Sequence, residues 1–226
     1  MQRYNMFHQV HKGLRALLYE TGTRLQHTDF WHLDEAEDII ERLEELMQLF
    51  HKHADSEDNF VFKAVEKYEP SVADAFEKEH VEDHLLSRQL SSAIRAFRDA
   101  PVINEKIVAS KAIHTAYSRF MVFNLAHMAK EEEVLNPLLW RYYSDRDLHE
   151  ITYAIISNIP PTHLAVFNKW MMRGLNNAEI TGWLKDVEKN APEHVFQSLF
   201  ALAEKELTPR RFRQVMEYLS EGAMLA

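Results

Sequence analysis

Histidine and carboxylate side chains recur along this chain at spacings that suit metal ligation. His80 and His84 lie four residues apart, so a helix would place both imidazoles on one face. The same interval joins a histidine to a glutamate in two further pairs, His53 with Glu57 and His127 with Glu131. One such pair is a weak indication of a metal site. Several pairs that converge in one fold would be a strong one.

Long helices must position these residues. Gly and Pro are scarce, at 5 and 7 of 226 residues, and apolar side chains recur at steps of three and four. The pattern predicts an all-α protein whose main helices span about 3–26, 34–68, 71–98 and 102–140. Short connections between four long helices favour an up-down-up-down four-helix bundle, whose interior is an established place for metal sites.

Local signals refine two of these helices. Asp34, with Glu37 three residues later, predicts the N-cap of the second helix. The inward stripe of this helix carries His53 and Glu57 and is expected to continue through Phe60. In the fourth helix the stripe is expected to include Val134, and Pro137 predicts an irregular end.

The candidate ligands total five imidazoles and two carboxylates. They are His11, His53, Glu57, His80, His84, His127, and either Glu131 or Glu132. Burying so many polar groups without partners would cost about 1–3 kcal/mol each, whereas metal ions would satisfy them all. The set is too large for one tetrahedral zinc ion and suits two six-coordinate ions bridged by two carboxylates and an oxygen, with one position open. Nitrogen and carboxylate donors without thiolate favour iron, with manganese or zinc as alternatives.

These residues resemble the haemerythrin-like (HHE cation-binding) domain family. The match covers roughly 4–143, with a lone His, then His-x-x-x-Glu, His-x-x-x-His, and a His followed by an acid. The resemblance implies a non-haem di-iron centre that binds dioxygen or a related ligand such as nitric oxide. By similarity, His80, His84 and His127 would hold one iron, and His11 and His53 the other, which keeps the open position. Glu57 and the acid of the last helix would bridge them.

Two assignments stay open between neighbours. At about 100° per residue, Glu131 lies about 40° from His127 around the helix and Glu132 about 140°. Regular geometry therefore favours Glu131, with Glu132 as the alternative if the helix bulges. His8 is about 60° from His11 and is the alternative ligand on the first helix. His11 is preferred because it continues the apolar stripe.

Composition restricts the partners. A net charge of −9 and a pI near 5.8 leave no broad positive field, so we expect no nucleic acid partner. The chain has no cysteine, which excludes disulfides and thiolate sites and is compatible with a reducing cytoplasm. It carries no signal-like or long uncharged apolar run, so we expect a soluble, cytoplasmic protein without membrane contact.

The last third of the sequence carries no ligand spacing. We therefore divide the chain into a metal-binding bundle, 1–143, and a helical extension, 144–226, that packs on the bundle or forms a homodimer surface. Asn176 with Glu179, and Thr208 with Pro209, predict helix starts there. Asn124 and Tyr117, on the stripe of His127, are expected either to hydrogen-bond around the site or to pack in the core.

The expected function is binding of dioxygen, nitric oxide or peroxide at a carboxylate-bridged di-iron centre. Such binding would serve oxygen or iron handling, sensing or a stress response. A binding protein is favoured over an enzyme. The alternatives are a di-iron oxidase, a peroxidase, an enzyme that repairs iron centres, or an interaction module in which the metals only stabilise the bundle.

Overall fold

The computed structural model describes residues 3–224, with side chains as far as 220. It divides the chain into two compact units. One comprises Met1–His8 and Leu17–Pro160, and the other Gln9–Ala16 and Pro161–Ala226. Helix α1, His8–His27, contributes residues to both units.

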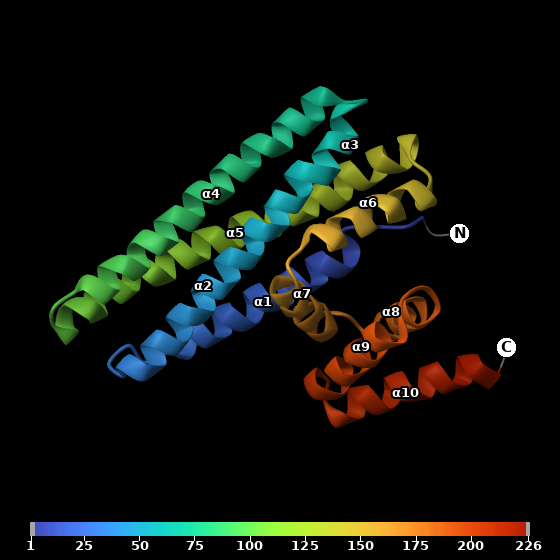
Figure 1. Ribbon diagram of the computed structural model, residues 1–226. Coiled ribbons are helices and arrows are strands. Elements are labelled where there is room, and N and C mark those ends of the chain that lie inside the picture. The colour runs from blue at the N-terminus through green and yellow to red at the C-terminus, as the bar shows by residue number, and fades with distance from the viewer. Residues whose placement is uncertain (1–2, 225–226) are drawn as a thin grey trace. The chain divides into compact units, whose positions relative to one another are not determined.

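The first unit confirms the predicted all-α bundle. Besides its part of α1, it contains α2 (Leu33–Ser56), η1 (Glu57–Val61), α3 (Phe62–Glu66), α4 (Pro70–Asp99), α5 (Ile103–Tyr142) and α6 (Asp145–Asn158). In Figure 1, α2, η1 and α3 form one continuous rod, and this rod, α4 and α5 alternate in direction. Edge-to-face packing of Phe50 against Phe120, with ring centroids 5.3 Å apart, joins α2 to α5.

The π-helical turn η1 is the main departure from the predicted helices. A single helix was expected over 34–68, but Glu57–Val61 forms a π turn within it. A π turn inserts an extra residue and shifts the register of the buried side that follows. Val61 and Phe62 are each 1% exposed, whereas Phe60 is only partly buried. The inward stripe therefore continues through Val61 and Phe62 rather than through Phe60 as predicted.

Two further helix details differ from prediction. Helix α2 begins at Leu33 with His32 as N-cap and no side-chain cap, so the predicted capping by Asp34 was wrong. Asp34 lies instead in the first turn, where its negative charge interacts favourably with the positive end of the helix dipole. Pro137 removes one backbone donor but lies inside α5, which continues to Tyr142. Val134, predicted to face inward, is 39% exposed.

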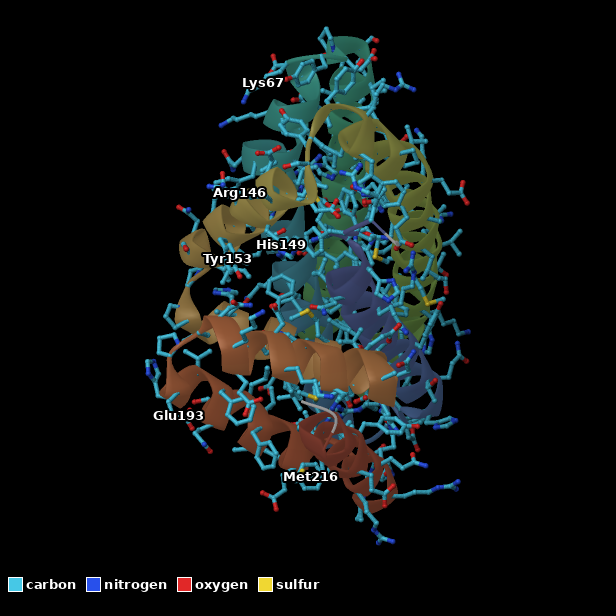
Figure 2. All side chains as sticks on the ribbon, turned by 90° about the vertical axis from the view of Figure 1, so that its right-hand side faces the viewer. Lys67, Arg146, His149, Tyr153, Glu193 and Met216 are labelled. Carbon is cyan, nitrogen blue, oxygen red and sulfur yellow. The ribbon has the colours of Figure 1, made fainter. Side chains whose placement is uncertain are left out.

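Helix α6 packs on the bundle. Its Leu148 is 1% exposed and belongs to a core cluster with Phe7, Phe62 and Phe76. On the same helix His149, labelled in Figure 2, stacks on the ring of Tyr4 with centroids 3.8 Å apart. The division expected between residues 143 and 144 separates α5 from α6, and α6 shares the core of the first unit.

Among the residues that the structure describes, the second unit contains four helices besides the α1 segment Gln9–Ala16. The helices are α7 (Pro161–Gly174), α8 (Asn177–Asn190), α9 (Glu193–Glu206) and α10 (Pro209–Met224). Asn176 and Glu179 form a reciprocal capping box at α8, as predicted. Thr208 Oγ1 accepts a hydrogen bond of 3.3 Å from the backbone N–H of Arg211 and caps α10.

Glycine permits backbone contact between the α1 segment and α7. A Cβ atom added at Gly174 would lie 2.3 Å from the carbonyl oxygen of Lys12, and one at Gly13 would lie 2.8 Å from the backbone nitrogen of Met171. Larger residues at these positions would force the two helices apart. Among the described residues, no helix has the length and apolar character needed to cross a membrane.

Candidate metal centre

Two groups of potential metal donors share a pair of carboxylates. One group is His11, His53, Glu57 and Glu131, and the other is Glu57, His80, His127 and Glu131. Within each group, one donor atom per residue can be chosen so that all lie within 4.8 Å of one another. All six residues are at most 8% exposed. The shared glutamates come from η1 and α5, so the second group combines donors of three bundle elements.

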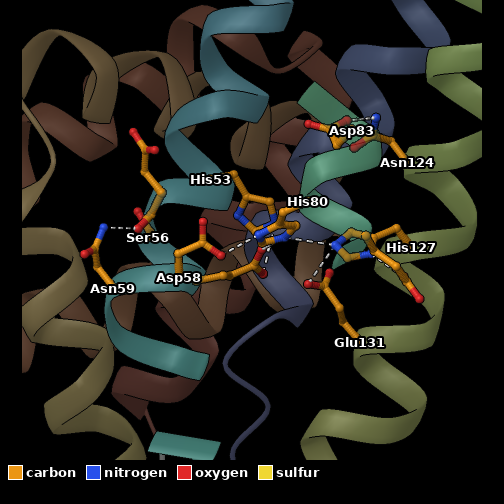
Figure 3. A network of polar contacts seen from close by, with 12 residues as sticks. His53, Ser56, Asp58, Asn59, His80, Asp83, Asn124, His127 and Glu131 are labelled. Atoms are coloured by element: carbon orange, nitrogen blue, oxygen red, sulfur yellow. Dashed lines mark hydrogen bonds and ion pairs between the residues drawn. The ribbon is translucent and has the colours of Figure 1, made fainter. Parts of the chain in front are cut away.

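The ring nitrogens of His80 and His127 converge. Their Nε2 atoms lie 3.1 Å apart. Figure 3 shows the two rings facing each other, joined by a dashed line. His127 Nε2 also lies 3.1 Å from Glu131 Oε1, and His80 Nε2 lies 3.5 Å from Glu57 Oε2. The other oxygen of Glu57 lies 3.2 Å from His53 Nε2. The carboxylate of Glu57 thus faces the second group with one oxygen and His53 with the other.

The opposite ring nitrogens face carboxylates. His80 Nδ1 lies 2.7 Å from Asp58 Oδ1, and His127 Nδ1 lies 2.8 Å from Glu79 Oε2. An ionised carboxylate only accepts hydrogen bonds, so each Nδ1 carries the proton and donates it. In the neutral tautomer, the lone pair of each ring is then on Nε2 and points toward the other ring.

Electrostatics indicate that this cluster attracts positive charge. Burial by itself lowers the pKa of His80, but hydrogen bonds to Asp58 and Glu57 and their charges outweigh it and raise the pKa to about 10. For His127 burial also lowers the pKa, and Glu131, with weaker help from Glu57 and Glu79, raises it. The carboxylates around both rings therefore favour positive charge at this place.

The donor set fits metal ions. The Nε2 atoms of His80 and His127 converge at 3.1 Å beside two buried carboxylates, and a metal ion that replaced the proton between them would use the lone pairs of both rings. Each group offers two imidazoles and two carboxylates, and neither contains a thiolate. Such donors suit iron, manganese or zinc. Carboxylates shared by both groups are suited to bridging two ions.

The structure distinguishes between candidate ligands that are close together in the sequence. Glu131 is 0% exposed and belongs to both groups, whereas Glu132 is half-buried and belongs to neither. His11, also 0% exposed, belongs to the first group, and His8 to neither. His84 is half-buried and lies outside both groups.

His84 has a different neighbour. Its ring packs edge to face on the ring of His51, with centroids 5.0 Å apart. The preceding residue, Asp83, is 4% exposed and accepts a hydrogen bond of 2.7 Å from the side-chain amide of Asn124. Burial is the main reason that the pKa of Asp83 is raised, and the bond from Asn124 lowers it only in part. Asn124 is thus a hydrogen-bonding group, one turn from His127.

Sequence reasoning missed Asp58, Glu79 and Asp83. Asp58 and Glu79 are each adjacent in sequence to a predicted ligand, and this adjacency is the signal that could have drawn attention to them. Tyr117, by contrast, donates a hydrogen bond of 2.5 Å to the backbone carbonyl of Leu18 and joins α5 to α1.

Aromatic side chains enclose the second group. The ring of Phe62 lies 4.9 Å from that of His80, centroid to centroid. Phe76 and Phe123 lie 6.0 and 5.8 Å from His127. Phe62 and Phe76 are each 1% exposed, so this wall limits the entry of water to the donors.

Comparisons with known proteins identify a matching family and two relatives. The model of the Hemerythrin HHE cation binding domain matches residues 2–148. Zinc finger protein BRUTUS-like of Arabidopsis thaliana is 25% identical over 201 residues, which cover 81% of this chain and 15% of that protein. Zinc finger protein BRUTUS of the same plant is 27% identical over 143 residues, 61% of this chain and 11% of that protein. The chain thus spans a small part of these relatives. No solved structure matches it.

Proposed function

The chain belongs to the family of haemerythrin HHE cation-binding domains, and on that premise we propose that its bundle holds a di-iron centre that binds a small ligand. Dioxygen, nitric oxide and peroxide are the candidate ligands. Manganese and zinc are the alternative metals. A cytoplasmic location and a homodimer belong to the same proposal.

The proposed ligands are the six residues of the two groups. His11 and His53 would hold one ion, His80 and His127 the other, and Glu57 and Glu131 would bridge them. The resemblance also assigns His84 to the second ion, although His84 lies in neither group. The observation that carries the proposal is the convergence of His80 and His127 at 3.1 Å beside two buried carboxylates.

A pair of irons bound here would supply a redox-active centre able to take up a small ligand. The chain's own residues prepare that place. Asp58 and Glu79 keep protons on the outer nitrogens of His80 and His127, so that the inner nitrogens are available as donors. Phe62 and Phe76 keep the surroundings apolar, which slows side reactions with water.

Metal analysis with an absorption spectrum of the purified protein tests the proposal. Two irons per chain and charge-transfer bands of a bridged diferric centre are expected. A protein that binds neither iron nor another transition metal would refute it.

A second measurement separates the roles. The anaerobically reduced protein is exposed to dioxygen and, separately, to nitric oxide and azide. Reversible uptake supports a carrier or sensor, whereas prompt oxidation with water as product favours an oxidase or peroxidase. A loaded centre whose spectrum responds to none of these ligands indicates a structural metal site.

A further inference from the structure

Each histidine of the second group is held between two carboxylates, one at each ring nitrogen. His80 has Glu57 at Nε2 and Asp58 at Nδ1, at 3.5 and 2.7 Å. His127 has Glu131 at Nε2 and Glu79 at Nδ1, at 3.1 and 2.8 Å. The Nδ1 contacts are the shorter ones. They fix the tautomer and the direction of each ring before any metal arrives.

The supporting carboxylates follow a cross-helix pattern. Asp58 is next to the proposed ligand Glu57 in the chain, but it contacts His80 on α4. Glu79 is next to His80, but it contacts His127 on α5. Two elements of the bundle therefore each carry a proposed ligand and, beside it, the support for a ligand on the next helix.

The π turn places Glu57 and Asp58 on the same imidazole. Both residues belong to η1, Glu57–Val61, and they reach opposite nitrogens of His80. In a regular α-helix adjacent side chains diverge by about 100°. The local widening of a π turn changes that direction, and such turns are frequent at functional sites. Figure 3 shows Asp58 reaching His80 from the rod of α2 and η1.

Glu79 is itself held in place. Lys130 donates a hydrogen bond to Glu79 Oε1, which leaves Oε2 for His127. The Lys130 ammonium also lies 4.8 Å from the centroid of the Phe76 ring, within reach of a cation–π contact. Glu79 thus bridges an exposed lysine and a buried imidazole.

We propose that Asp58 and Glu79 are positioning residues that orient His80 and His127 and set the metal affinity of the second group. The inference rests on the proposed function, because the orientation matters only if this group binds a metal. Hydrogen bonds from metal-ligating histidines to carboxylates raise ligand basicity, and their loss typically weakens metal binding about 10–100-fold.

The test compares the full chain with Asp58→Asn and Glu79→Gln. Both substitutions keep size and remove charge, and both side chains reach the surface, with 38% and 26% exposure, so the fold is expected to survive. Glu82→Gln is the matched control, because Glu82 is an exposed acid on the same helix as Glu79. Zinc affinity is measured by chelator competition, and folding by circular dichroism and thermal unfolding.

Each variant is expected to lose affinity for one of two bound zinc ions by about 10–100-fold, with the control unchanged. A second readout is the Nδ1–H proton signal in NMR spectra of the diamagnetic zinc-loaded protein. Asp58→Asn should shift or broaden the signal of His80 alone, and Glu79→Gln that of His127 alone. A merely structural role would not produce this selectivity.

The possible failures are distinguishable. If the wild-type chain binds two zinc ions and both variants match it in affinity and in the Nδ1–H signals, the positioning role is refuted and the proposed centre stands. A variant that loses both ions together with its helical signal would count against positioning and for a structural role. If the wild-type chain binds neither zinc nor iron, the proposed function fails, and this inference fails with it.

Discussion

Replacing Glu131 by Gln is expected to disrupt both proposed metal sites. Glu131 is fully buried, its Oε1 lies 3.1 Å from His127 Nε2, and it belongs to both donor groups. Glutamine has nearly the same shape but no charge, so it offers a much weaker donor at the same place. Glu132→Gln removes a charge from the next residue, which is half-buried and in neither group.

The magnitude follows from typical metal affinities. Structural zinc sites with four ligands bind with about 10–16 kcal/mol at neutral pH, or about 2.5–4 kcal/mol per ligand. At about 1.4 kcal/mol per tenfold change, losing Glu131 should weaken binding by about 10²–10³-fold. Because Glu131 serves both groups, the affinity for both ions should fall. Glu132→Gln should stay within about threefold of wild type, since a half-exposed charge is largely screened.

Anaerobic titration with Fe²⁺ against a competing chelator measures both affinities, and metal analysis after desalting gives the stoichiometry. Circular dichroism of the metal-free variants serves as the folding control. If Glu131→Gln retains two irons at wild-type affinity while Glu132→Gln loses them, the placement of the bridging carboxylate is refuted. That result would indicate a local bulge in α5 that turns Glu132 inward.

Three further predictions concern the histidines of α4, the pH dependence of stability and two glycines. His80→Ala should lower the iron content to about one per chain or less, whereas His84→Ala should retain both irons; equal loss by the two variants would make His84 a ligand. In the metal-free protein the pKa of His80 is raised from 6.5 to about 10, so its contribution to stability is complete below about pH 6.5 and is lost as the pH rises through about 10. Urea unfolding from pH 6 to 10 checks this, and a His80→Gln variant with an equally steep decline would contradict it. Gly174→Ala should destabilise the second unit by about 1–3 kcal/mol, because the new Cβ would meet a backbone carbonyl at 2.3 Å. Gly182→Ala is the control, because nothing lies within 4 Å of the added Cβ, and it should stabilise helix α8 by up to about 1 kcal/mol. Calorimetry measures the stability of both variants. Equal effects of Gly174→Ala and Gly182→Ala would refute the close approach of α7 to the α1 segment.

Periodicity alone determined much of the bundle. Residues four apart on a helix share a face, so His53 with Glu57 and His127 with Glu131 could be paired without a structure. Those pairs lie within 3.2 and 3.1 Å. The same geometry favoured Glu131 over Glu132, and the structure places Glu131 in both donor groups. These results follow from local helix geometry.

Tertiary packing decided which side of α4 faces inward after His80. Asp83 and His84 lie about 60° and 40° from His80 on opposite sides, so helix geometry allows either one to turn toward the core. Asn124 on α5 binds the carboxylate of Asp83, and His51 on α2 packs on His84. Asp83 is therefore buried and His84 is not. These contacts join residues that are far apart in sequence, so the local sequence pattern does not predict them.

The sequence by itself determined the helices, the spacing of the His and Glu pairs and the resemblance to a metal-binding family. Only the tertiary structure decided the π turn at Glu57–Val61, which shifts the register of the second helix and brings Asp58 to His80. It also decided that Glu79, adjacent to one imidazole in the chain, supports the imidazole of another helix. The physical reason is that spacing defines the face of each helix, whereas the partner of a side chain depends on how separate helices pack.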